Sequence, residues 1–222
     1  MFGLGLSGQT TRLVVAVFFV VCGYLVVAQD SSNEGQPSST DEPAFCNGLE
    51  CPKFKEINKT QNYEERDYAP SRWVSTRLDA VKYDEAVDVL MMKLYHYIAG
   101  KNSRNQAIPM TAPVLCHVVL GRDGAHGESN ITMFLYLSPS LTDPPEPTDN
   151  AVVLTDLPEQ KVFTRSFGGF AKEDDYLKNT MALAEALVRD SEDFDNSYFY
   201  TASYDSPFKP LNRHNEVWYV AK

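Results

Sequence analysis

The chain of 222 residues carries 30 Asp and Glu against 20 Lys and Arg, which gives a formal net charge of −10 at neutral pH. Proteins that bind nucleic acids or anionic membrane surfaces need clustered Lys and Arg, so this charge argues against both classes of partner. The same excess of acid suits a soluble protein whose copies repel one another.

The N-terminus predicts a secretory signal peptide. Arg12 precedes an apolar run over residues 13–27, and Val26 and Ala28 place small side chains at positions −3 and −1 of a cleavage site. As a helix the run would rise about 22 Å, short of a ~30 Å hydrocarbon core, which favours cleavage over the alternative, a signal anchor. We therefore expect residues 1–28 to be removed. The mature protein would begin near Gln29 and be secreted, extracellular and free of the membrane.

The next segment, residues 29–44 (QDSSNEGQPSSTDEPA), is almost without apolar side chains. It cannot bury enough surface to offset the entropy lost on ordering, so we expect a disordered acidic linker. Residues 45–222 remain as one domain of ordinary size, long enough to build a hydrophobic core.

The four cysteines separate into three groups. Cys22 leaves with the signal peptide, while Cys46 and Cys51 enclose an Asn47-Gly48 turn signal. In an oxidising compartment we expect Cys46 and Cys51 to form a disulfide, since no second ligand pair makes a zinc site. Cys116 lies in an apolar run and is expected to be a buried free thiol.

Two glycosylation sequons follow the signal peptide, Asn58-Lys59-Thr60 and Asn130-Ile131-Thr132. Neither has proline in the middle position, so both are acceptors in a secreted chain. We predict a glycoprotein modified at Asn58 and Asn130.

The folded part opens with extended segments and a helix. Residues 63–76 (YEERDYAPSRWVST) are rich in aromatic and β-branched side chains, which predicts two strands bent at Ala69-Pro70. Residues 82–99 show apolar side chains at three- and four-residue spacing, which predicts a helix ending at Gly100. His96 lies about 150° from the centre of that apolar stripe, on the polar side. The stripe comprises Tyr83, Ala86, Val87, Leu90, Met91, Leu94, Tyr97 and Ile98.

The remaining pattern repeats this order. Residues 112–120 and 131–137 predict a hairpin, and a proline-rich loop follows. A second amphipathic helix is predicted over residues 173–190. The other predicted strands are 152–154, 161–167, 198–203 and 216–220. Two strand–helix–strand–strand halves, in which YEERDY resembles KVFTRSF, would build one antiparallel sheet closed on itself with two helices outside, an α+β fold.

Motifs for catalysis are absent from the sequence. It contains no G-x-S-x-G elbow, no H-E-x-x-H, no phosphate loop and no C-x-x-C. We therefore expect a protein that is not an enzyme.

Five segments together resemble the SOUL family of heme-binding proteins. They are YEERDYAPSRWVST, YHYIAGKN, IPMTAPV, RSFGGFAKE and YDSPFKPLNRHNEVW, in that order along residues 63–219. The resemblance implies a distorted antiparallel β-barrel with two flanking helices and a pseudo-twofold repeat. It also implies non-enzymatic binding of heme or another tetrapyrrole.

Similarity to that family further implies a site on an apolar patch of the first helix. Met91, Leu94, Tyr95 and His96 stand in that region, and Lys209 matches a lysine expected to meet a propionate. Asp88 replaces a basic residue of relatives, and Asp67 replaces a histidine proposed as an iron ligand. His96 is then the best remaining candidate for the metal.

Two residues near the C-terminus complete the candidates. His214 precedes the last strand, where a structural role is expected rather than metal ligation. Glu216 shares strand parity with Trp218 and Val220, so its carboxylate is expected to be buried and paired with Arg213 or Arg165. A second hypothesis makes Glu216 a pocket acid for a cationic ligand, as in the effector-binding domains of bacterial regulators.

The sequence leaves two functions to compare. The first is a secreted binding protein for heme or a related tetrapyrrole. The alternative is an extracellular protein-interaction module, which keeps the fold, binds a protein partner and does not ligate heme.

Overall fold

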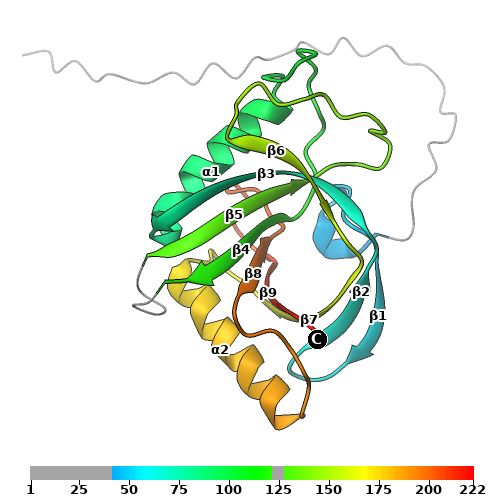
Figure 1. The fold of residues 1–222 in the computed structure, drawn as a ribbon. Helices are drawn as coiled ribbons and strands as arrows, with labels where there is room; N and C mark the ends of the chain where they lie inside the picture. Colours follow the sequence, from blue (N-terminus) through cyan, green and yellow to red (C-terminus); the bar gives the residue numbers. More distant parts are fainter. Residues whose placement is uncertain (1–41, 122–127) are drawn as a thin grey trace, which may run out of the picture. The chain divides into compact units, whose positions relative to one another are not determined.

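The computed structural model describes residues 42–121 and 128–222 (Figure 1). The expected signal peptide and nearly all of the expected linker therefore lie outside the described residues. None of the helices in the described ranges is long and apolar enough to cross a bilayer. The elements, in chain order, are η1 (Ala44–Cys46), β1 (Phe54–Lys59), β2 (Glu64–Tyr68), β3 (Ser71–Val81), α1 (Tyr83–Ile98), β4 (Val114–Leu120), β5 (Ser129–Tyr136), β6 (Val152–Leu157), β7 (Gln160–Phe167), α2 (Glu173–Arg189), β8 (Phe199–Ser203) and β9 (Asn215–Val220).

The strands form one antiparallel sheet of nine strands in the order β1-β2-β7-β9-β8-β4-β5-β3-β6. The sheet curls into a half-barrel, with both helices outside the curl (Figure 1). This confirms the expected α+β class. Within residues 42–121 and 128–222 no ladder joins the edge strands β1 and β6, so the barrel stays open.

The expected pseudo-twofold repeat is visible in the strand order. Reading outward from the β8–β4 pair, β9, β7 and β2 on one side match β5, β3 and β6 on the other. The segments YEERDY and KVFTRSF, compared as equivalents in the sequence, are instead neighbours: β2 pairs with β7 from Glu64↔Thr164 to Tyr68↔Gln160. The equivalent of β7 is β3.

Strand β1 was not predicted from the sequence. Its two apolar side chains, Phe54 and Ile57, are three positions apart and therefore point to opposite faces of the strand. It lacks the alternating pattern that identifies a half-buried strand. β1 is a strand because it pairs with β2, from Phe54↔Tyr68 to Lys59↔Glu64.

The helices cover the outer face of the sheet and leave its centre free. α1 packs against β3 and β5, and α2 against β7 and β9. The predicted α1 stripe is confirmed, with Ala86, Leu90 and Leu94 fully buried. Gly100 ends the helix at a φ of 108°, in the left-handed region that favours glycine. Strands β4 and β8, between the two helices, form the floor of a groove.

The inner face of the half-barrel holds a second core. Aromatic side chains of the sheet pack there against the N-terminal segment around η1. Cys46 and Cys51 form the expected disulfide in this segment, with a Cα–Cα distance of 6.2 Å, and Cys116 is a buried free thiol as expected. The aromatic members are Tyr68, Trp73, Phe134, Tyr136, Tyr200, Tyr204 and Trp218.

Candidate functional site: the groove between the helices

A cavity of about 220 Å³ lies between the first turns of α1, the start of α2 and the floor of the sheet. We call this space the interhelical groove. Its position follows from the topology, because the helices sit over the two outer thirds of the sheet and β4 and β8 are left between them. Its lining residues are Tyr83, Asp84, Val87, Asp88, Val114, Cys116, Met133, Ala171, Tyr176, Thr201 and Ser203.

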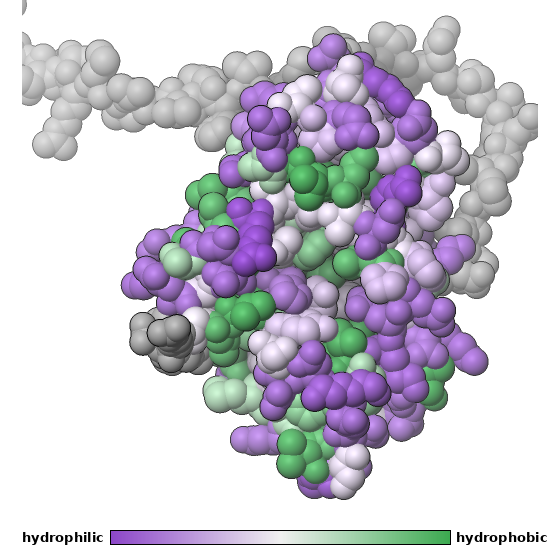
Figure 2. Space-filling view, in the orientation of Figure 1, coloured by the Kyte–Doolittle hydropathy of each residue, from purple (hydrophilic) through white to green (hydrophobic). Residues whose placement is uncertain are grey.

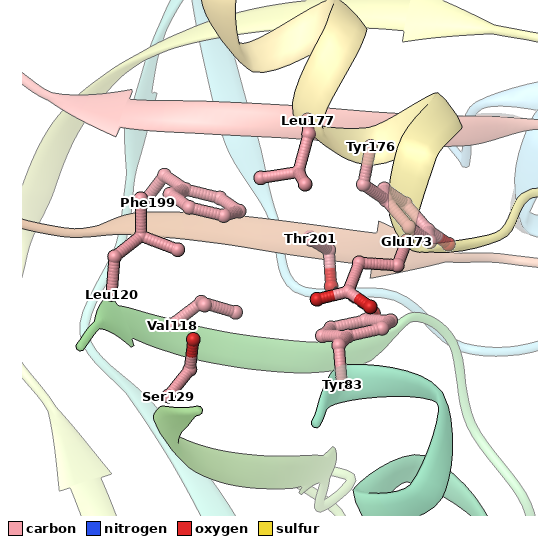
Figure 3. Close-up of a pocket in the computed structure, with 9 residues that line it drawn as sticks. All are labelled: Tyr83, Val118, Leu120, Ser129, Glu173, Tyr176, Leu177, Phe199 and Thr201. Atoms are coloured by element: carbon pink, nitrogen blue, oxygen red, sulfur yellow. Dashed lines mark hydrogen bonds between the residues drawn. The ribbon is translucent and has the colours of Figure 1, made fainter. Parts of the chain in front are cut away.

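Two tyrosines from the two helices meet across the groove. The ring centroids of Tyr83 and Tyr176 are 5.5 Å apart. Beyond them lies a much smaller space of about 10 Å³, walled by Leu177, Phe199 and Val118 (Figure 3). The paired rings therefore close one end of the groove.

The floor of the groove is polar but uncharged. The Tyr83 and Thr201 hydroxyls are 2.7 Å apart and hydrogen-bonded. Burial raises the pKa of Tyr83 well above its usual value, and burial raises the pKa of Cys116 to about 12. Both groups therefore keep their protons at neutral pH, and the floor offers hydroxyl and thiol groups rather than ions.

The rim of the groove is acidic. Asp84 and Asp88 stand one turn apart on α1, and Asp84 Oδ1 accepts a hydrogen bond of 3.2 Å from the backbone N–H of Glu173. Glu173 points from α2 toward Tyr83 (Figure 3). Among the residues that the structure describes, Asp84 and Asp88 line the groove, Glu173 lines only the smaller space, and no basic residue lines either one.

The residues expected on the α1 patch divide among three sides of the helix. At 100° per residue, Met91 and Tyr95 lie on the same side as Val87 and Asp88, the side that faces the groove. Met91 is half-buried and Tyr95 is 51% exposed. Leu94 points inward, is 0% exposed and belongs to the hydrophobic core, and its contact with a ligand stays a prediction.

His96 lies away from the groove side. It is five positions beyond Met91, which places it about 140° around the helix from that residue. Its ring is half-buried and has no hydrogen-bond partner within the described ranges. In residues 42–121 and 128–222 no group of three or more His, Cys, Asp or Glu could hold a metal ion. The geometry separates His96 from the residues with which it was expected to act.

Lys209 and Asp67 lie in different surroundings. The Lys209 ammonium contacts Asp205 Oδ1 at 2.5 Å and Asn47 Oδ1 at 2.8 Å, so it links the β8–β9 loop to the N-terminal segment. Asp67 lies on β2, opposite Lys55 on one side and Lys161 on the other. An acid between two lysines is well placed for sheet pairing.

Glu216 is buried as expected, but its partner is Arg66. Arg66 Nη1 lies 3.2 Å from Glu216 Oε2, and Nη2 lies 3.1 Å from Oε1. The expected partners are occupied elsewhere: Arg213 donates to backbone carbonyls of its own loop, and Arg165 to the Asn62 carbonyl and Asn179 Oδ1. Sequence reasoning missed Arg66 because β7 separates its strand from β9.

An aromatic and hydrogen-bonding cage surrounds this pair. The Arg66 guanidinium carbon lies 4.5 Å from the Phe54 ring centroid, and Tyr204 and Trp218 donate hydrogen bonds to Glu216 Oε2 at 3.0 and 2.7 Å. Burial alone would raise the pKa of Glu216. The hydrogen bond with His214 and the charge of Arg66 outweigh burial and lower the pKa to about 2. The position that could receive a cationic ligand already holds the chain's own guanidinium.

His214 supports the same cluster. Its Nε2 lies 2.7 Å from Glu216 Oε1, and its ring stacks on Phe45 with centroids 4.4 Å apart. The imidazole is therefore engaged on its edge and its face, in agreement with the structural role expected for it.

The two sequons lie in different environments. Asn58 is exposed on the edge strand β1. Asn130 is half-buried on β5, where its Oδ1 accepts a hydrogen bond of 3.2 Å from the N–H of Ala80. Ala80 has a φ of 52°, so Asn130 supports a bulge in β3.

Relatives of known type share most of this domain. The chain is 40% identical to heme-binding protein 2 of Homo sapiens over 186 residues, covering 82% of this chain and 90% of that protein. It is 30% identical to heme-binding protein 1 of Xenopus laevis over 178 residues, covering 78% and 93%.

Solved structures share the fold at low sequence identity. The C-terminal domain of EcmrR aligns with a TM-score of 0.55 at 7% identity, over 72% of this chain and 98% of that one. A hydrolase from Listeria innocua aligns with a TM-score of 0.51 at 10% identity, over 75% and 94%. These likenesses concern the fold alone. The model of the SOUL heme-binding protein family matches residues 49–220, and with the 40% identity to heme-binding protein 2 this establishes that the chain belongs to the SOUL family.

Proposed function

We propose that the protein is a non-enzymatic binding protein for heme or a related tetrapyrrole, and that the interhelical groove holds the macrocycle. Family membership supports the ligand class. The observation that carries the location is the groove side of α1: Val87 lines the cavity, and Met91 and Tyr95 continue the same side of the helix one and two turns further along. Planar apolar ligands bind against such walls by burying surface.

The size of the cavity sets how the ligand would sit. About 220 Å³ is below the roughly 300–1,000 Å³ of pockets that enclose drug-sized ligands. One edge of a tetrapyrrole would enter between the helices, and the rest would lie against Met91 and Tyr95. On the face shown in Figure 2, apolar surface occurs in patches interrupted by polar side chains.

The residues of the groove fit the macrocycle but not an iron ligand. Its described lining contains no histidine, and its methionine, Met133, is fully buried. Tyrosinate and cysteinate can ligate heme iron, but burial raises the pKa values of Tyr83, Tyr176 and Cys116, which keeps these groups protonated. His96 lies on another side of α1. We therefore propose that affinity comes from the ring system and does not depend on the metal. Absence of catalysis is part of the same proposal, supported by a floor of protonated hydroxyl and thiol groups.

Paired titrations test this function. Hemin and iron-free protoporphyrin are added to the full-length protein, followed by absorbance and by quenching of tryptophan fluorescence. Saturation near one equivalent by both ligands is expected. Met91→Ala should lower the affinity for both ligands equally. Met92→Ala should lower the affinity for neither, because Met92 is the next residue along the helix but lies about 100° around it. If neither ligand saturates the wild-type protein, the protein-interaction module becomes the better hypothesis.

Secretion belongs to this proposal as well. It is supported by the apolar run of residues 13–27, by the Cys46–Cys51 disulfide and by the exposed sequon at Asn58. Sequencing of protein recovered from the culture medium should find an N-terminus at or near Gln29, with glycan on Asn58. An intact N-terminus on a membrane-bound form would exclude the proposal.

A further inference from the structure

We infer that the interhelical groove selects its ligand by charge, and that it favours a tetrapyrrole with an uncharged or cationic edge over one that carries two carboxylates. The inference rests on the proposed function, since it concerns the same groove. It adds a property that the apolar walls alone do not specify. The property comes from the acidic rim.

The acids at the rim are placed to face a ligand. Asp84 and Asp88 are four positions apart, which sets them about 40° apart on the groove side of α1. Glu173 of α2 lines only the smaller space beyond the Tyr83–Tyr176 pair, so the charge that faces the groove is that of Asp84 and Asp88. Among the described residues no basic side chain lines the groove, so a ligand carboxylate entering here would meet the like charge of these two aspartates.

The two α1 acids have different roles. Asp84 lies in the first turn, where a carboxylate offsets the positive end of the helix dipole, and it also binds the first N–H of α2. Asp88 lies one turn further along and is exposed, with no ion pair or hydrogen bond within residues 42–121 and 128–222. Its charge is therefore uncompensated and directed at the ligand.

The basic side chains of the neighbouring β8–β9 loop already have partners. Lys209 contacts Asp205 and Asn47. The Arg213 guanidinium donates to the carbonyls of Ser206, Lys209 and Asp205 and lies over Phe170 at 4.5 Å. Each would have to give up these contacts before it could meet a propionate directly. The acceptors of Arg213 are neutral carbonyls, so it keeps its positive charge near Tyr176, but it does not line the groove.

The test uses three forms of iron-free protoporphyrin that share one macrocycle: the dicarboxylic acid, its dimethyl ester and its bis(aminopropyl) amide. Dissociation constants are measured by porphyrin fluorescence for the full-length wild-type protein, for Asp88→Asn and for Glu185→Gln. Glu185 is an exposed acid on α2 that lines neither cavity. Glu185→Gln is the control because it changes the net charge by the same amount as Asp88→Asn. The affinity of the wild type should rise in the order acid, ester, amide.

Asp88→Asn should lower the dissociation constant of the acid and raise that of the amide, each about two- to fivefold, as for an exposed charge pair. The dissociation constant of the ester should stay unchanged. Glu185→Gln should leave all three dissociation constants unchanged. The effect of Asp88→Asn should become smaller in high salt, because salt screens the charge. If the acid binds the wild type as tightly as the amide, the charge inference fails and the proposed function stands. Equal changes of the dissociation constants in Asp88→Asn and Glu185→Gln would also overturn the inference, because the net charge of the protein would then explain the preference without an acid in the groove. If none of the three saturates, the proposed function itself fails.

Discussion

Arg66 and Glu216 lie 150 residues apart in the sequence and form a doubly hydrogen-bonded ion pair inside the half-barrel, at 3.1 and 3.2 Å. Glu216 is 0% exposed and Arg66 is 1% exposed. Their strands are not neighbours, because β7 lies between β2 and β9. Each side chain therefore spans the inner face of the sheet to meet the other. The ring of Phe45, next to Cys46, and the ring of Phe54, on β1, lie against the guanidinium at 5.4 and 4.5 Å.

Removing one partner of this pair should strongly destabilise the fold. Arg66→Met leaves a buried carboxylate without its guanidinium, so we expect a loss of about 3–5 kcal/mol in the free energy of unfolding. The double variant Arg66→Met with Glu216→Gln should be more stable than Arg66→Met alone, because no bare charge remains. Chemical denaturation measures all four forms of the cycle. Strictly additive losses would show that the two residues do not act as a pair.

Stability should fall in acid because of Glu216. Its folded pKa of about 2 lies below the ordinary value of 4.5. The stabilisation is therefore fully present above about pH 5 and is lost as the pH falls through 4.5 toward 2. The shift corresponds to about 3 kcal/mol. The unfolding free energies of wild type and Glu216→Gln, measured from pH 6 to 2, should converge as the pH falls. A constant difference between them would contradict the assignment.

The disulfide should stabilise the inner core modestly. Cys46 and Cys51 are five positions apart, and a loop this short contributes about 2 kcal/mol through the unfolded state. Replacing both with Ser should lower the free energy of unfolding by that amount. A larger loss would indicate that Phe45, next to Cys46, also packs more loosely against Tyr204 and His214. Peptide mapping without reductant should recover the Cys46–Cys51 peptide and a free Cys116. A bridge to Cys116 would refute the pairing.

Substitution of His96 should have little effect on either ligand. Because His96 lies about 140° from Met91 on α1, His96→Ala should change the affinities for hemin and for iron-free protoporphyrin by less than about twofold. The absorbance spectrum of bound hemin should also be unchanged. A selective loss of hemin affinity, with a shifted Soret band, would instead identify His96 as the iron ligand.

Local periodicity was sufficient to predict both helices and most strands. The α1 stripe places Ala86, Leu90 and Leu94 on one face whatever the helix packs against, because 3.6 residues per turn fixes their direction. The short spacing of Cys46 and Cys51 likewise allowed their pairing to be predicted. Strand β1 escaped prediction because the order of FKEINK comes from the ladder with β2 rather than from its own side chains.

Long-range geometry decided the candidate site. The parity of Glu216 with Trp218 predicted its burial, but only the strand order brings Arg66 rather than Arg213 to it, since sequence distance carries no information about neighbours in a sheet. Resemblance to the SOUL family assigned Met91, Leu94, Tyr95 and His96 together to a patch of the first helix. The tertiary structure separates them: packing against the sheet buries Leu94, and the position of β4 and β8 determines which side of α1 is a groove. A helix sets the angles among its own side chains, but its partners decide which of those angles face a ligand.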